Sequence, residues 1–222
     1  MAGIGVKLNN IYGKRTLTTN IIGMGYSTVM TIAPMLTVIG ALCIMEHFLG
    51  FDSVGYATRE LFSCTVLYIF IFSLLTASPF NSVLSKYMSD IIYEETFEDI
   101  LPCYYVGMIL NITFSALFGI SFCIHEYLVG NVDIIYVFTG YCGFVALVLV
   151  FYSMLYLSIC KDYKKISFFF MIGMTVTVLL SFLFVKVIHM SITYGMLLAL
   201  AIGFWMIACL EFALIRSYFR EN

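Results

Sequence analysis

One stretch of the sequence concentrates side chains that could do chemistry. SKYMSDIIYEETFEDILP, from Ser85 to Pro102, holds five acidic side chains and one lysine between two long apolar runs. Carboxylates at this density form a negative surface that suits a cationic polymer or a basic protein face. Three of them, Glu95, Glu98 and Asp99, also suit the start of a following helix, where the helix dipole favours negative charge. Asp90 and Glu94 are then the acids left for binding.

The remaining reactive side chains do not converge on a site. The three histidines have no partner at a metal-ligand spacing, and the seven cysteines include no C-x-x-C pair, so we expect small buried thiols and no metal centre. The chain has no G-x-x-x-x-G-K-[ST] phosphate loop, so we expect no ATP hydrolysis by this chain alone. We therefore predict neither an enzyme nor a cofactor, and we predict no nucleic-acid partner.

A few polar side chains lie inside the apolar runs and could line a passage. Asn111 is the most polar residue that we expect deep in a helix, where it either contacts a substrate or hydrogen-bonds a neighbouring helix. Tyrosine rings could stack on sugars, although belts at the membrane interface also explain several of them. The tyrosines available for such a role are Tyr26, Tyr68, Tyr104, Tyr105, Tyr141, Tyr152 and Tyr156.

These groups must be positioned by membrane-spanning helices. Of the 222 residues, 62% are hydrophobic and only 11% are charged, and the mean hydropathy is +1.02. An all-α integral membrane protein with six transmembrane helices is predicted, because each of six charge-poor runs holds the roughly 20 residues that cross a bilayer. The expected spans are approximately 20–45, 61–85, 100–124, 134–160, 166–186 and 190–213, in a single membrane domain with a cytoplasmic connector at 86–99.

Basic residues set the expected orientation. Nine Lys and Arg residues fall on one side of the predicted membrane, and only Arg59 and Lys186 fall on the other. The positive-inside rule therefore places both termini in the cytoplasm.

Three prolines punctuate the helices. Pro102 fits the first turn of the third helix, with Asp99 as its N-cap, and before it we expect a short interfacial helix followed by an elbow at Glu94 to Thr96. Pro34 and Pro79 fall inside spans, where each removes a backbone hydrogen bond and is a candidate hinge.

Two segments resemble the PelG family, the membrane transporters of the Pel exopolysaccharide system. The start MAGIG is similar to the N-terminus of that family, and the stretch from Ser85 to Pro102 is similar to its first cytoplasmic connector. The connector similarity rests on Ser85, Tyr87, Ser89, Asp90, Tyr93, Glu98, Ile100, Leu101 and Pro102. The chain departs from the family pattern at Lys86, where an arginine is expected, and at Ala33-Pro34-Met35, where the family tends towards Gly-Pro-Trp.

The resemblance implies a polysaccharide exporter of the flippase (MOP) superfamily, in the cytoplasmic membrane of a bacterium. It implies one six-helix lobe of a two-lobe (6+6) transporter, working by alternating access with a second lobe or as a homodimer. It also implies partnership with a cytoplasmic glycosyltransferase and other Pel-type membrane subunits, and it leaves the coupling ion open. The alternatives are a non-transporting assembly subunit of a polysaccharide synthesis complex, and a lipid or drug exporter of the same superfamily.

Overall fold

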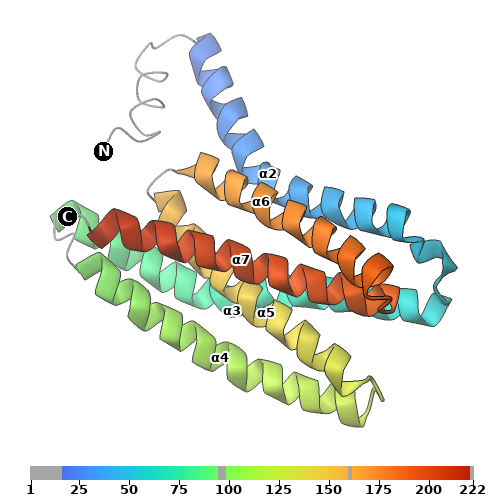
Figure 1. Cartoon of the computed structure of the whole chain (residues 1–222). Helices are drawn as coiled ribbons and strands as arrows, with labels where there is room; N and C mark the ends of the chain where they lie inside the picture. Colours follow the sequence, from blue (N-terminus) through green and yellow to red (C-terminus); the bar gives the residue numbers. More distant parts are fainter. Residues whose placement is uncertain (1–16, 95–98, 160–161, 221–222) are drawn as a thin grey trace.

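The computed structural model describes residues 17–94, 99–159 and 162–220, and these residues form a bundle of long helices (Figure 1). No strand occurs among them. The elements in chain order are α2 (Leu17–Leu49), η1 (Phe51–Ser53), α3 (Tyr56–Glu94), α4 (Ile100–Leu128), α5 (Ile134–Ile159), α6 (Tyr163–Phe182), η3 (Leu183–Val187) and α7 (Ile192–Arg220).

Six of these helices are long and apolar enough to cross a membrane: α2, α3, α4, α5, α6 and α7. The predicted all-α membrane fold is therefore confirmed for the described residues. Large apolar side chains on the outer surface fit contact with lipid; on α4, for example, Ile109, Leu117 and Phe118 are 58–64% exposed.

Helix α5 lies at the centre of the bundle. It packs against α7, α3 and α4, while α6 packs on α7 and α2 packs on α6. Residues 143–150 of α5 are all buried, so this helix is enclosed on every face over two turns. We use the name connector end for the end of the bundle that holds Glu94, Ile100, Ile159 and Arg220, and far end for the opposite one.

Helix α3 differs from its predicted form. It runs without a break for 39 residues, or about 58 Å at 1.5 Å per residue, so the separate interfacial helix expected between Tyr87 and Tyr93 was wrong. The stretch from Asn81 to Glu94 contains no glycine or proline that would stop the helix. Of the predicted elbow, Glu94 is the last residue of α3, and residues 95–96 lie outside the described part.

The start of α4 is also simpler than predicted. Asp99 occupies the N-cap position, but its side chain makes no capping hydrogen bond. Its φ of −82° and ψ of −11° are already helical, whereas a capping side chain folds back from an extended backbone. Pro102 is the third residue of α4, where its missing N–H leaves no carbonyl unpaired.

The other two prolines lie inside α2 and α3. Helix α2 changes direction along its length, so that its dark-blue first part leaves the bundle and its paler part runs beside α6 (Figure 1). Pro34 is the proline within this helix, and the Thr37 hydroxyl donates a hydrogen bond of 2.7 Å to its carbonyl. The hinge role of Pro34 and Pro79 stays a prediction.

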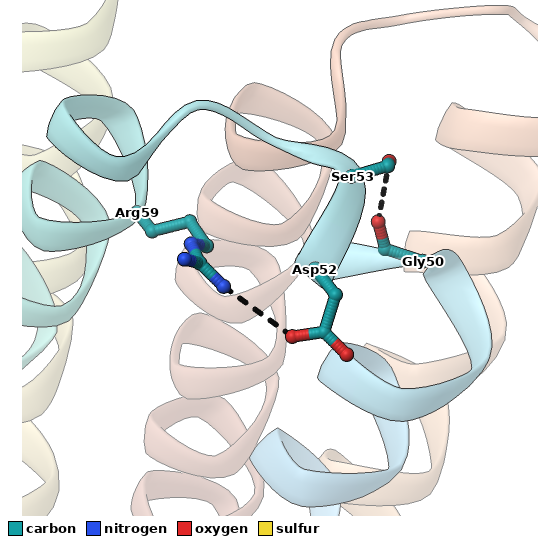
Figure 2. A network of polar contacts seen from close by, with 4 residues as sticks. All are labelled: Gly50, Asp52, Ser53 and Arg59. Atoms are coloured by element: carbon teal, nitrogen blue, oxygen red, sulfur yellow. Dashed lines mark hydrogen bonds and ion pairs between the residues drawn. The ribbon is translucent and has the colours of Figure 1, made fainter.

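Polar contacts fasten the loops at the far end. Figure 2 shows Arg59 reaching Asp52, with 3.3 Å between Nη1 and Oδ1, and the Ser53 hydroxyl donating to the Gly50 carbonyl at 2.6 Å. Gly50 has a φ of +73°, which suits a residue without a side chain.

Two further contacts tie α7 to the neighbouring loops. At the far end, the Tyr194 hydroxyl donates a hydrogen bond of 2.6 Å to Asp133, which lies just before α5, and this bond holds the pKa of Asp133 below its usual range. At the connector end, the Tyr218 hydroxyl lies between Asp162 and Lys165, at the start of α6.

Helices α6 and α7 approach each other through two glycines. A methyl group on Gly203 would overlap the Thr177 hydroxyl and lie 3.1 Å from the Gly173 carbonyl oxygen. A methyl group on Gly173 would in turn overlap Ile207. Small residues at facing positions let membrane helices pack closely, and Ala199 and Gly203 give α7 such a pair at a spacing of four.

Replacing Gly203 by alanine should therefore push α6 and α7 apart. We expect Gly203→Ala to lower the free energy of unfolding in detergent by about 1–3 kcal/mol, the usual cost of overpacking. Gly40→Ala is the matched control, because a methyl group there meets nothing within 4 Å. Equal stability of the two variants would contradict the close contact.

Candidate functional site

Three buried tyrosines form a hydrogen-bonded cluster between α4 and α5. Tyr152 and Tyr156 lie one turn apart on α5, and Tyr104 lies opposite them on α4; each is no more than 1% exposed. The Tyr104 and Ser153 hydroxyls are 2.7 Å apart, and the Tyr152 hydroxyl donates to the Tyr104 carbonyl at 2.9 Å. The Tyr152 and Tyr156 hydroxyls are 3.1 Å apart. We call Tyr104, Tyr152, Ser153 and Tyr156 the tyrosine cluster.

The aromatic rings of the cluster also pack closely against one another. Tyr104 stacks on Tyr152 at 16° with 5.4 Å between the centroids, and it meets Tyr156 edge to face at 4.8 Å. Gly107, one turn after Tyr104, makes room, because a methyl group there would overlap the Tyr152 hydroxyl. The cluster is thus a rigid polar core inside an apolar bundle.

A carboxyl group lies beside this cluster. Glu211, on α7, is 0% exposed, and neither of its side-chain oxygens has a hydrogen-bond partner among the described residues. The next residue, Phe212, packs on Tyr104 and Tyr105 with 6.2 and 6.1 Å between ring centroids. Acidic residues buried in a spanning helix are costly and usually functional.

The sequence analysis missed Glu211. Asn111 is not the most polar side chain buried in a span, because the Glu211 carboxyl is buried as completely. A signal existed: Glu211 is the single acid between residues 163 and 220, and apolar residues both precede and follow it. Glu211 lies only two residues before the predicted end of the last span at residue 213, but α7 continues to Arg220.

Two side-chain amides, of Asn81 and Asn111, add further buried and unpaired oxygen acceptors. The Asn111 side chain donates to the Gly107 carbonyl of its own helix at 2.9 Å, and the Asn81 side chain donates across to the Phe151 carbonyl of α5 at 3.3 Å. The Oδ1 atoms of both residues lack a partner among the described residues. The hydrogen bond that the Asn111 amide donates thus stays within α4. The predicted role of Asn111 in a substrate pathway stays a prediction.

The residues of the predicted connector similarity, from Ser85 to Pro102, lie apart from the tyrosine cluster and Glu211. Lys86, Tyr87 and Asp90 are exposed on α3, whereas Met88 and Ile91 of the same turn are buried. Ser85 is half-buried and Pro102 is exposed. Ser89, Tyr93 and Glu94 belong to α3 but have no described side chain, and Glu98 lies outside the described residues. The binding role of Asp90 and Glu94 stays a prediction.

A second feature is an apolar groove at the far-end half of α3, α4 and α5. It has a volume of about 460 Å³ and includes two of the tyrosines named above, Tyr68 and Tyr141. Its polar lining includes Thr65 and Glu126. In the described part of the chain, no three His, Cys, Asp or Glu side chains gather as a metal-ligand set, and six of the cysteines are free thiols.

The tyrosine cluster can be tested by a double-mutant cycle. Tyr104→Phe removes the hydroxyl that pairs with Ser153, and Ser153→Ala removes its partner. We expect each single change to lower the free energy of unfolding in mixed micelles, and the pair to show a coupling energy of about 0.5–2 kcal/mol. Tyr127→Phe, at an exposed position on α4, is the control. Purely additive effects would contradict a hydrogen bond between the two hydroxyls.

Comparisons with known proteins identify the family. The sequence profile of the PelG family, described as candidate exopolysaccharide exporters (EPS-E), matches residues 1–222. No curated protein and no solved structure matches the chain. The match covers the whole sequence and agrees with the predicted resemblance, so the chain belongs to the PelG family of exopolysaccharide exporters.

Proposed function

We propose that this protein is a transporter lobe that helps move an exopolysaccharide across the cytoplasmic membrane by alternating access with a second lobe. The observation that carries the proposal is the family match over all 222 residues of a chain with six membrane-spanning helices. Both termini and the 86–99 connector face the cytoplasm in this proposal, where a glycosyltransferase would deliver the polymer.

The packing of the bundle supports a path at its surface. Residues 143–150 of α5 fill the centre, and apolar side chains make up most of the described interior, together with the tyrosine cluster and a few further polar residues such as Asn111 and Glu211. A hydrated sugar chain is too bulky and polar for such a close-packed interior. The polymer therefore runs along an outer face, and a second bundle, either another lobe or another copy, closes the path from the other side.

A row of hydroxyls on α3 is our candidate for that face. Ser78 and Ser82 are exposed, and Ser85 continues the row one turn on. The Ser82 hydroxyl donates a hydrogen bond of 3.0 Å to the Ser78 carbonyl. The lone pairs of the Ser82 oxygen therefore remain able to accept a hydrogen bond from a substrate. Pro79 lies beside the row, and a bend there would tilt the connector part of α3 between two states.

The proposal is tested by polymer secretion. In a strain lacking the gene, we expect secreted exopolysaccharide to be lost while the synthesis enzymes remain at normal levels, and a plasmid copy should restore secretion. Secretion that continues unchanged without the gene would overturn the exporter role.

The path is tested by one variant with a matched control. Ser82→Leu should lower secretion about tenfold, equivalent to about 1.4 kcal/mol of barrier, without lowering the amount of protein in the membrane. Thr113→Leu removes an exposed hydroxyl from α4, outside the row, and should leave secretion unchanged. If the two variants behave alike, the α3 face is not the path.

A further inference from the structure

The Glu211 side chain belongs to the inward face of α7. Phe204, Glu211 and Ile215 follow each other at spacings of seven and four, which places them on one side of the helix, and all three are 0% exposed. Phe204 packs against Phe70 of α3 with 5.6 Å between the ring centroids. The carboxyl group therefore faces the packed interior of the described bundle and is shielded from its surface.

Among the described residues, no basic side chain is hydrogen-bonded to Glu211. The titratable groups of the neighbouring cluster are Tyr104 and Cys103 on α4 and Tyr152 and Tyr156 on α5, none of which is a cation at neutral pH. Arg216, five residues further along α7, is exposed. On α3 the buried polar residues nearest the Phe70 contact are Ser73 and Thr76, which are neutral.

The basic side chain that contacts α7 from α6 is engaged elsewhere. Lys165 binds Tyr218 and forms an ion pair of 3.3 Å with Asp162, and Tyr218 lies two turns beyond Glu211. An ionised carboxylate without a counter-ion or hydrogen-bond donors is strongly unfavourable in such an interior, and the group takes up a proton instead.

We propose that Glu211 is a proton-binding site that carries its proton in this packed state and releases it to water when the bundle opens during export. The inference rests on the proposed function for its link to export. The released proton leaves a carboxylate on Glu211, which a hydroxyl must then stabilise.

Tyr104 is placed to stabilise that carboxylate. Its hydroxyl shares one hydrogen bond with Ser153, in which either group can donate. When Ser153 donates, the Tyr104 hydroxyl proton remains available for Glu211. No hydrogen bond joins Glu211 to Tyr104 in the packed state, so the ionised form would gain a charged hydrogen bond, which is the stronger kind.

The chemistry of the site favours a proton over a metal ion. A hard cation needs about six oxygen ligands, whereas a proton needs one. The unpaired acceptors here are the two Glu211 oxygens and the Oδ1 atoms of Asn81 and Asn111, on three different helices, while the cluster hydroxyls are already paired.

The first experiment measures the protonation of Glu211 directly, and the second measures secretion. Infrared spectra of the purified chain in lipid vesicles near neutral pH should show a buried carboxylic-acid carbonyl band, because an exposed glutamate is ionised there and gives none. Glu211→Gln should abolish this band, whereas Glu60→Gln, at an exposed position on α3, should leave it unchanged. Identical spectra from wild type and Glu211→Gln would overturn the proposal, as would a band that responds to added sodium chloride at fixed pH.

Secretion supplies the second readout. In wild type the export rate should change with pH by up to about tenfold per unit on its titrating limb, and Glu211→Gln should make the rate independent of pH. Glu211→Asp keeps a titratable group and should keep a pH dependence, which separates a proton site from a packing role. If the band behaves as expected but deletion of the gene leaves secretion intact, the proton site stands and the exporter role fails.

Discussion

The enclosure of α5 is the constraint on which the rest of the bundle depends. A helix that is buried on every face over residues 143–150 must be surrounded, and α3, α4 and α7 supply the surrounding surface. Because α3, α4 and α7 cover α5, α6 packs on the outer side of α7, and α2 packs in turn on α6. The polar residues of the interior follow the same logic, because Tyr152, Ser153 and Tyr156 lie on this central helix and find their partners on the helices around it.

Much of the fold could be read from the sequence because the physical signal is strong. Apolar runs of about 20 residues or more bounded by charges mark spanning helices whatever their neighbours are. The ends of the helices were harder to predict, because they depend on whether residues that interrupt a helix, such as glycine or proline, are present. Residues 81–94 contain none, so α3 continues where a charge-based boundary predicted a stop.

The candidate site was only partly predictable, and the reason is geometric. Tyr104, Tyr152 and Tyr156 were recognised as available, but nothing in their spacing says that α4 and α5 place them together. Glu211 was missed because an acid near a helix end usually reaches water, and only the packing of α7 against its neighbours shows that this one does not. Contacts between distant segments are the information that a single sequence lacks.

The unbroken length of α3 has a mechanical consequence. The groove at Tyr68 and the exposed turn at Lys86 belong to one helix and are 18 residues, or about 27 Å, apart along it. A ladder of backbone hydrogen bonds joins them, and Pro79, which lacks an N–H donor, lies between the two. A displacement of the Lys86 turn would therefore reach the wall of the groove through the helix itself, except for whatever part a bend at Pro79 absorbed.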